Sequence, residues 1–587
     1  MLEMATSPEK TRGQWRLFGN EPAVAGFAML VALLITGSIV LLQRNLRAGQ
    51  YDPEGVTIFY RLFIFEDYPA SFLFIATLLI AAVPQAQRTA VALSRSIGEH
   101  PLLVSVVTCV VLAAGAVWVY HAHPLSMDES APYMQSKVFA AGKLLGQYPP
   151  DLLDWLIYPP FQNYFIQVSH QTGEIASSYW PGFALLLTPF MAAGVPWLCN
   201  PVLGALSVWV IHRLTLRLTR SVEAAGASAL FTLASAAFVM NAISFYSMAA
   251  HLLCNAVFAL LLLRPTPGRC VAAGFIGGLA LTLHNPIPHM LFAAVWLLWL
   301  ATQKNRWILL GSIAAGYLPW IIVVGLGWSH LLHSLMEGST ATAQSVAGGR
   351  SQIAEALKTL GNVFKLPGPT QLEDRLIAVS KIWLWAAPLS VLLAALGFWR
   401  HRGDTHFRLL VASAAVTFVG YLFVPLNQGH GWGFRYFHSV WFVLPIFAAA
   451  ALAPARKEPA TDAGSEANSL GRWTLAGALG GLLIMTPYFA WQVHTFIGSD
   501  LAQIPATDHG QPRVIFINSS IGYYRQDLVQ NDPFLRESPI RMVTHGRSED
   551  ARMMAQQFPD FVLLTQSPRG SVWGYPGNVE PPRLKGR

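Results

Sequence analysis

The chain has 587 residues, of which 53% are hydrophobic and only 12% are charged. Soluble globular proteins carry roughly twice that charged fraction, so the composition excludes a cytosolic enzyme, and the excess of apolar residues excludes a disordered chain. The net charge is +8, but the Lys and Arg residues stand in short clusters between apolar blocks, which argues against a nucleic-acid partner.

Apolar blocks recur along the chain and are long enough to cross a bilayer of roughly 30 Å at 1.5 Å per residue. Hydropathy and block length predict roughly thirteen transmembrane helices and therefore a polytopic all-α membrane protein. The expected spans are 23–43, 69–87, 101–121, 201–219, 225–243, 246–263, 270–284, 287–302, 307–328, 380–399, 407–426, 437–454 and 473–494.

Basic residues in the short loops predict the orientation. Lys10, Arg12 and Arg16 precede the first span, and every second loop after it is basic. Because basic loops stay on the cytoplasmic side, the N-terminus is expected inside, and thirteen spans then place the C-terminus outside. We expect a multi-pass protein of the bacterial inner membrane with a periplasmic or extracellular C-terminal domain. An internal eukaryotic membrane with a lumenal active face satisfies the same physics.

Two outer loops are long, at 121–200 and 329–380. Within the first, residues 181–198 are apolar but short and interrupted by prolines, which predicts an interfacial or re-entrant segment rather than a span. Within the second, an amphipathic helix is expected near 351–360. Any chemistry belongs to the outer face or the membrane, because the inner loops are too short to hold a catalytic domain.

The expected organisation has three parts. An N-terminal segment with two transmembrane helices (1–100) precedes a transmembrane catalytic domain (101–495) and a small outer α/β domain (496–587). The tail alternates short apolar runs with one polar helical pattern. Its strands are predicted at 514–518, 540–544 and 561–564, and its helix at 548–558.

The acidic pair Asp128-Glu129 follows the third span, on the outer side. One carboxylate can act as general base toward an acceptor hydroxyl, and the other can orient substrate or hold Mg²⁺ or Mn²⁺. The alternative is that the pair stabilises the N-terminus of a following helix, with Ser126 or Asp128 as its cap. The two roles are compatible.

Two histidine-containing clusters lie at predicted outer junctions of spans. The first, His284-Asn-Pro-Ile-Pro-His289, does not have the spacing of a zinc site, so hydrogen bonding to a sugar or pyrophosphate is the more modest interpretation. The second runs from Asn427 through His430 to Arg435-Tyr436 and is rich in glycine. Glycine permits close backbone approach, and the planar fork of Arg435 suits a lipid phosphate. The alternative is that Arg435 meets ordinary headgroups.

The chain resembles the membrane glycosyltransferases of the GT-C superfamily, in particular the protein O-mannosyltransferase and aminoarabinose transferase group (family 39-like and 83-like). The resemblance covers roughly residues 100–455. It rests on Asp128-Glu129, the stretch Tyr179-Trp-Pro-Gly-Phe, the helix from Asn200 to Arg217 and Arg220, and the loop Gly431-Trp-Gly-Phe-Arg435-Tyr436. Two spans precede the one that leads into the acidic loop, whereas the family usually begins with that span.

The resemblance implies a polyprenyl-phosphate-linked sugar donor and an acidic residue, here Asp128, that acts as base or binds the acceptor. We therefore expect an inverting glycosyltransferase. Arg435, with His430 and Tyr436, is expected to neutralise the departing lipid phosphate, and His284 and His289 to line the site. The expected partners are the donor, membrane lipids and an acceptor glycan, lipid or protein.

Two other classes of function remain open. A transporter or flippase for a lipid-linked or anionic solute predicts charged residues at mid-membrane and an internal repeat, and the sequence has no evident repeat. The second class is an inactive scaffold whose tail binds a partner.

Overall fold

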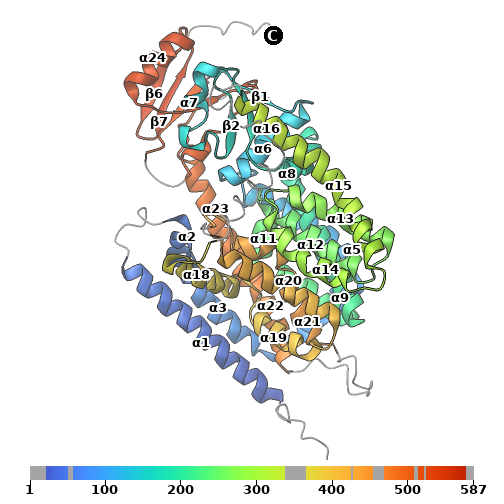
Figure 1. Cartoon of the computed structure of the whole chain (residues 1–587). Coiled ribbons are helices and arrows are strands. Elements are labelled where there is room, and N and C mark those ends of the chain that lie inside the picture. Colours follow the sequence, from blue (N-terminus) through green and yellow to red (C-terminus); the bar gives the residue numbers. More distant parts are fainter. Residues whose placement is uncertain are drawn as a thin grey trace, which may run out of the picture.

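The computed structural model describes residues 21–49, 57–337, 365–424, 428–453, 469–507, 513–520 and 524–576. In these ranges the chain is a bundle of helices with a small sheet-containing domain at one end (Figure 1). The helix expected near 351–360 and residue Asn427 lie outside the described residues.

The N-terminal segment forms two long apolar helices on one side of the bundle (Figure 1). The second span begins at Ile58 rather than near residue 69. It continues through a π-helical turn, a feature that often occurs at functional or strained positions. The elements are α1 (Glu21–Ala48), α2 (Ile58–Arg61), η1 (Leu62–Glu66), α3 (Asp67–Ala81) and α4 (Pro84–Glu99).

The first outer loop is ordered and contains both helices and strands. Its three short strands form an antiparallel sheet in the order β1-β3-β2. The apolar block 181–198 gives a helix of only 11 residues, α8, which is too short to cross a bilayer. The elements are α5 (Pro101–Trp118), α6 (Met127–Ala140), β1 (Gly146–Gln147), α7 (Leu153–Leu156), β2 (Ile166–Val168), β3 (Glu174–Ser177) and α8 (Gly182–Ala192).

The rest of the bundle consists of apolar helices joined by short turns. Its first half comprises α9 (Cys199–Thr219), α10 (Val222–Leu233), α11 (Ala236–Ile243), α12 (Met248–Leu262), α13 (Pro267–Thr282), α14 (Ile287–Ala301), α15 (Arg306–Pro319), η5 (Trp320–Leu326) and α16 (Gly327–Glu337). Its second half comprises α18 (Pro369–Trp385), α19 (Ser390–His401), α20 (Thr405–Leu422), η6 (Arg435–Val440), α21 (Val443–Ala450), α22 (Ser469–Gly480), η7 (Gly481–Met485) and α23 (Thr486–Leu501).

The polytopic helical class, for which roughly thirteen spans were expected, is confirmed. In the described ranges, 7 helices are long and apolar enough to cross a membrane, or up to 9 if each of two bent pairs is one span. The bent pairs are α10–α11, at 65°, and α18–α19, at 94°. Hydropathy windows count apolar residues but do not register such breaks, and several apolar blocks fold as helices shorter than 18 residues.

The C-terminal domain is a four-stranded mixed sheet with one helix. The strands β4 (Arg513–Ile517), β5 (Ile540–Val543), β6 (Val562–Ser567) and β7 (Gly570–Gly574) are ordered β5-β4-β7-β6, and α24 spans Arg547–Gln557. The three predicted strands and the predicted helix are present. The sequence analysis missed β7, which pairs with both β4 and β6.

The C-terminal domain shares a hydrophobic core with the first outer loop. Met127, Met134 and Ile166 of the loop are buried in one cluster with Phe516 and Met542 of the sheet. Figure 1 shows the two parts side by side at the same end of the bundle. The tail and this loop therefore form one structural unit, because their apolar faces are buried against each other.

Candidate active site

Asp128 lies in the first turn of α6, where the sequence predicted a helix cap. Ser126 has the extended backbone of an N-cap residue, and its backbone N–H donates to Glu129 Oε2 at 3.3 Å. The two acids therefore complement the positive end of the helix dipole. Because neighbouring helical residues point in different directions, Asp128 and Glu129 enter different surroundings.

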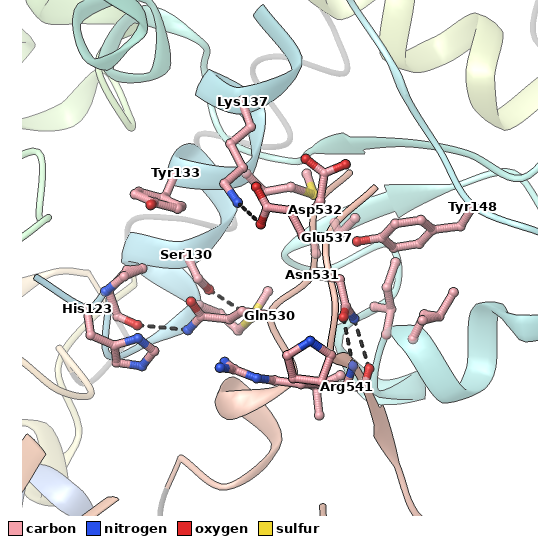
Figure 2. Close-up of a pocket in the computed structure, with 18 of the residues that line it drawn as sticks. His123, Ser130, Tyr133, Lys137, Tyr148, Gln530, Asn531, Asp532, Glu537 and Arg541 are labelled. Atoms are coloured by element: carbon pink, nitrogen blue, oxygen red, sulfur yellow. Dashed lines mark hydrogen bonds and ion pairs between the residues drawn. The ribbon is translucent and has the colours of Figure 1, made fainter. Parts of the chain in front are cut away.

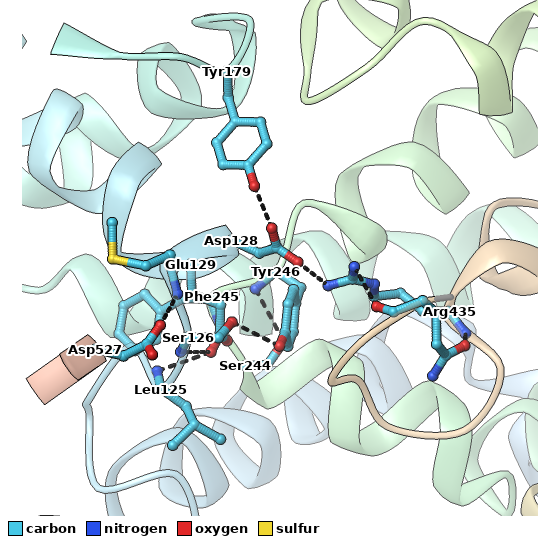
Figure 3. A network of polar contacts seen from close by, with 12 residues as sticks. Leu125, Ser126, Asp128, Glu129, Tyr179, Ser244, Phe245, Tyr246, Arg435 and Asp527 are labelled. Carbon is cyan, nitrogen blue, oxygen red and sulfur yellow. Dashed lines mark hydrogen bonds and ion pairs between the residues drawn. The ribbon is translucent and has the colours of Figure 1, made fainter. Parts of the chain in front are cut away.

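The carboxylate of Asp128 is held by two residues from distant parts of the chain (Figure 3). Arg435 Nη1 lies 2.5 Å from Asp128 Oδ2, across 307 positions of sequence. The hydroxyl of Tyr179 donates to Asp128 Oδ1. The side chains of Asp128 and Arg435 are 20% and 9% exposed. The predicted acid and the predicted phosphate-binding cation thus form one partly buried ion pair.

The glycine-rich loop positions Arg435 through Gln428. The Gln428 side chain accepts from the Arg435 backbone N–H at 3.0 Å, and the Gln428 carbonyl accepts from Arg435 Nη2 at 2.8 Å. Gly431 and Gly433 have φ values of 146° and 70°. Only glycine adopts such angles without strain. The loop therefore aims the guanidinium at α6, over the ring of Tyr246 at 5.0 Å.

The charge state of the pair follows from its surroundings. Burial alone favours the neutral form of Asp128, but Arg435, His284 and Tyr179 outweigh it and lower the pKa of Asp128 to about 2. The pKa of Arg435 is raised by Asp128 despite burial. Both groups are therefore ionised at neutral pH. While paired in this way, Asp128 is a weak base, since a carboxylate with so low a pKa has little affinity for a proton.

Glu129 has a different environment from its neighbour. It is fully buried, and it accepts hydrogen bonds from the Tyr120 hydroxyl at 2.8 Å and from the backbone N–H groups of Leu125, Ser126 and Phe245 at 2.9, 3.3 and 2.8 Å. Burial raises the pKa of Glu129 to about 7, and these donors oppose the rise. Its contacts link α6 to the turn between α11 and α12, which makes it a positioning residue.

His284 is the predicted histidine that the structure brings to the pair. Its ring stacks on Tyr179, with centroids 4.1 Å apart. Close by, α8 packs tightly against the end of α13: a Cβ atom at Gly182 would come within 2.6 Å of the Thr282 carbonyl oxygen. His284 therefore stands beside the residue that holds Asp128.

His430 is buried next to the pair but makes no polar contact there. Its ring lies among Tyr246, Trp432, Phe496 and Tyr524. Neither ring nitrogen has a hydrogen-bond partner among the described residues. Burial, and then Arg435, lower the pKa of His430 to about 3, so the imidazole is neutral.

Two other predicted site residues have contacts of their own. His289 is buried between helices, where Nδ1 lies 2.7 Å from Asn255 Oδ1 and Nε2 lies 2.6 Å from the Tyr317 hydroxyl. These bonds occupy both ring nitrogens. Tyr436 stacks on Tyr421 at 4.5 Å. The roles of both residues at the site stay predictions.

Sequence reasoning missed Asp527 and Tyr246. The backbone N–H of Met127 donates to Asp527 Oδ1 at 2.6 Å, and the Ser126 hydroxyl lies 2.9 Å from the Tyr246 hydroxyl. Both residues hold the start of α6 from outside the loop. Burial raises the pKa of Asp527 to about 7. No local pattern could have identified Asp527, which is 400 positions from its partner.

The acidic pair does not present a cation site in this arrangement. The oxygens of Glu129 accept four donors, and those of Asp128 are taken by Arg435 and Tyr179. Within the described ranges, no group of three or more His, Cys, Asp or Glu residues could hold a metal ion. Binding of Mg²⁺ or Mn²⁺ stays a prediction that requires one of these contacts to open.

No family model and no curated protein matches the sequence. Among solved structures, the chain is similar to ArnT from Cupriavidus metallidurans bound to undecaprenyl phosphate, with a TM-score of 0.49 and 12% identity over 82% of this chain and 99% of that one. It is also similar to ArnT from the same organism in the apo state, with a TM-score of 0.43 and 12% identity over 79% and 97% of the two chains. These similarities concern the arrangement of the helices and say nothing about the reaction.

Proposed function

We propose that the protein is a GT-C-type glycosyltransferase that moves a sugar from a polyprenyl-phosphate-linked donor to an acceptor on the outer face of the membrane. The observation that carries the proposal is the ion pair between Asp128 and Arg435. An acid suited to a hydroxyl acceptor and a cation suited to a phosphate leaving group lie in direct contact, although they come from opposite halves of the chain. Glycosyl transfer from a lipid phosphate needs both groups at one point.

The donor phosphate takes the place of Asp128 on Arg435 in this mechanism. A guanidinium binds phosphate through two parallel N–H groups, and it stabilises the negative charge that grows on the phosphate as the glycosidic bond breaks. Arg435 Nη2 remains on Gln428, so the guanidinium keeps its orientation during the exchange. The partly exposed position of the pair gives a headgroup access to it.

Asp128 becomes a stronger base when Arg435 engages the phosphate. Loss of its paired cation raises the pKa of the carboxyl group toward its usual range. Asp128 then accepts the proton of the acceptor hydroxyl while that oxygen bonds to the anomeric carbon and the bond to the lipid phosphate breaks. The Tyr179 hydroxyl keeps Asp128 in position. One displacement inverts the anomeric configuration.

A transporter or flippase is the second candidate, and one observation favours it. Lys381 Nζ lies 2.6 Å from Asp67 Oδ2, and both side chains are 1% exposed. Asp67 lies within the candidate span Ile58–Ala81. Ionisable groups inside a span are costly and commonly mark ion or substrate pathways. The glycosyltransferase proposal instead treats this pair as a structural contact between the N-terminal spans and α18.

Sugar transfer by the purified full-length protein tests the proposal. A radiolabelled polyprenyl-phosphate-sugar pool is supplied, and transferred or released sugar is measured for wild type and Asp128→Asn. We expect a loss of about 100-fold or more in the variant, the usual size of a general-base contribution. Asp151→Asn, an exposed acid in the same loop, is the matched control and should retain full activity.

Equal activity in wild type and Asp128→Asn would reduce Asp128 to a helix-capping residue and overturn the mechanism. Absence of turnover with every donor by a folded wild-type protein, combined with movement of a lipid-linked solute across proteoliposomes, would establish the transporter.

A further inference from the structure

A cavity of about 250 Å³ lies between α6 and the segment 529–541 of the C-terminal domain. Ser130, Tyr133 and Lys137 of α6 and Arg541 of that segment are among its lining residues, and Figure 2 shows Ser130 and Lys137 on the helix above Arg541. Met127 also lines it. Because Asp128 is on the same helical turn but points to Arg435, the cavity and the candidate active site lie on two faces of one turn.

The acidic side chains of the cavity are already neutralised. Lys137 Nζ lies 3.1 Å from Glu537 Oε2. Asp532 lies 3.1 Å from both Nε and Nη2 of Arg536. Each acid therefore has its own cation, and no negative charge in the lining remains for another positive group.

Arg541 is the lining cation that has no ion pair among the described residues. The one hydrogen bond of its guanidinium in the described structure is to the Leu528 carbonyl oxygen at 3.4 Å. The Asn531 side chain forms hydrogen bonds with the backbone of Arg541 and not with its guanidinium: it accepts from the Arg541 N–H at 2.8 Å and donates to the Arg541 carbonyl at 2.9 Å. Burial lowers the pKa of Arg541. A half-buried guanidinium with donors to spare is unfavourable unless an anion meets it.

His123 provides a second unsatisfied group beside Arg541. Its Nε2 atom is buried and has no hydrogen-bond partner among the described residues. Burial, and then Arg541, lower the pKa of His123 to about 3. A neutral imidazole donates one N–H, and Figure 2 shows this ring on the side of the cavity toward which the Arg541 side chain extends. The two residues together offer a fork of N–H donors and one further donor.

We propose that this cavity binds a carbohydrate that carries an oxyanion, either phosphate or carboxylate, with Arg541 and His123 as the anion-binding residues. Tyr133 and Tyr148 supply aromatic walls for a sugar ring. The volume is below the roughly 300–1,000 Å³ of pockets for drug-sized ligands, which suits about one sugar unit. That this ligand is part of the acceptor rests on the proposed function; the anion site itself does not.

Binding to the full-length protein in detergent is the test, with glucose 6-phosphate and glucuronate as anionic probes and glucose as the neutral probe. Isothermal titration is expected to show both anions binding to wild type at least about tenfold more tightly than glucose, since charge-assisted hydrogen bonds are roughly twice as strong as neutral ones. Arg541→Gln should weaken the binding of both anions by about tenfold or more. Arg541→Lys should weaken it less, because lysine keeps the positive charge but lacks the two parallel N–H donors of the guanidinium. Arg552→Gln, an exposed arginine of α24, should bind like wild type.

Four outcomes would overturn the proposal or part of it. Equal anion binding by wild type and Arg541→Gln places the site elsewhere, and absence of anion binding by folded wild type removes it. Inorganic phosphate binding as tightly as glucose 6-phosphate overturns the carbohydrate assignment. Thermal melting distinguishes a binding role of Arg541 from a structural one. The melting temperature of Arg541→Gln should be no lower than that of wild type. A clearly lower melting temperature in the variant, together with no rise in the wild-type melting temperature when the probes are added, would make Arg541 a structural residue.

The variant Asp128→Asn separates this proposal from the proposed function. It should lose sugar transfer and keep anionic-probe binding, because Asp128 faces away from the cavity. Arg541→Gln should reduce transfer mainly through KM for the acceptor. Unchanged transfer kinetics in Arg541→Gln, together with lost binding of the probes, would contradict the acceptor assignment and leave the anion site in place.

Discussion

Arg435 has two partners that compete for one guanidinium, the Asp128 carboxylate in this structure and the donor phosphate in the proposed reaction. Arg435→Gln removes the cation and leaves Asp128 partly buried without its charge partner. Sugar transfer is expected to fall by about 100-fold or more, the usual cost of losing an electrostatic stabiliser of developing charge. Arg569→Gln, an exposed arginine of the β6–β7 turn, is the matched control. Transfer near the wild-type level in Arg435→Gln would exclude Arg435 as the phosphate ligand.

The low pKa of Asp128 gives a prediction about pH profiles. In the free protein the pKa is about 2. The stabilisation from the ion pair is therefore full above the unfolded value of about 4 and is lost as the pH falls toward 2. When phosphate takes Arg435, the pKa of Asp128 rises. The acidic limb of kcat, which reports the complex, should then lie at higher pH than the acidic limb of kcat/KM, which reports the free enzyme. Coincident limbs would contradict the exchange.

The contribution of Asp527 to stability should change with pH in the opposite direction to that of Asp128. Its pKa is raised to about 7 by burial. Its stabilising contribution is therefore full below about pH 4, declines as the pH rises, and is lost above about pH 7. The melting temperature of wild type should fall as the pH rises from 5 to 8, and the melting temperature of Asp527→Asn should fall less over the same range. Asp560→Asn, an exposed acid of the same domain, should follow wild type. An identical slope in Asp527→Asn would contradict the assignment.

At the scale of elements, the position of α6 depends on Glu129. Four donors converge on this carboxylate from Tyr120, Leu125, Ser126 and Phe245. Glu129→Ala strands these donors and is expected to lower the free energy of unfolding by about 3 kcal/mol. Asp128→Asn should cost less, because Asp128 is partly exposed. Chemical denaturation in detergent measures both, and the reverse order would indicate that Glu129 is not the anchor of α6.

The outer loop and the C-terminal domain should depend on each other for stability. Gln147 donates its backbone N–H to the Pro533 carbonyl at 2.8 Å, and Gln530 donates to the Pro124 carbonyl at 2.8 Å. The two parts also share the core around Phe516. Truncation after residue 507 exposes the apolar face of the loop. Limited proteolysis should then cut the loop between residues 141 and 178, and a loop that stays protected would make the tail an independent appendage.

At the scale of the whole molecule, the Lys381–Asp67 pair links the N-terminal spans to α18. Lys381→Met leaves a buried carboxylate without its partner and should destabilise the protein by about 3–5 kcal/mol. Lys381→Met combined with Asp67→Leu removes both charges and should regain most of that stability. If the double variant also keeps sugar transfer, the pair is structural. A stable double variant that loses all activity would favour the transporter.

Much of the architecture follows from the sequence because its signals are local. Apolar run length and helical caps depend on neighbouring residues, so the polytopic helical class, the helix of residues 548–558 and three strands of the tail are confirmed. In the described ranges, 7 to 9 helices are long and apolar enough to span a membrane where roughly thirteen spans were expected, because bends such as the one at 94° between α18 and α19 leave the hydropathy unchanged. The hairpin strand β7 was missed because its sequence, Gly-Ser-Val-Trp-Gly, has little strand pattern of its own.

The sequence by itself determined which side chains were available, an acidic pair after a span and an arginine in a glycine-rich loop. Only the tertiary structure decided how they are used. Packing of α6 against the α11–α12 turn buries Glu129, while the preceding residue, Asp128, forms an ion pair with Arg435, 307 positions away in the sequence. The tertiary structure also stacks the ring of His284 on Tyr179, whereas His289 forms a hydrogen bond with Asn255. The physical reason is that hydropathy and helix signals act over a few residues, whereas contacts between charged side chains depend on which helices pack together.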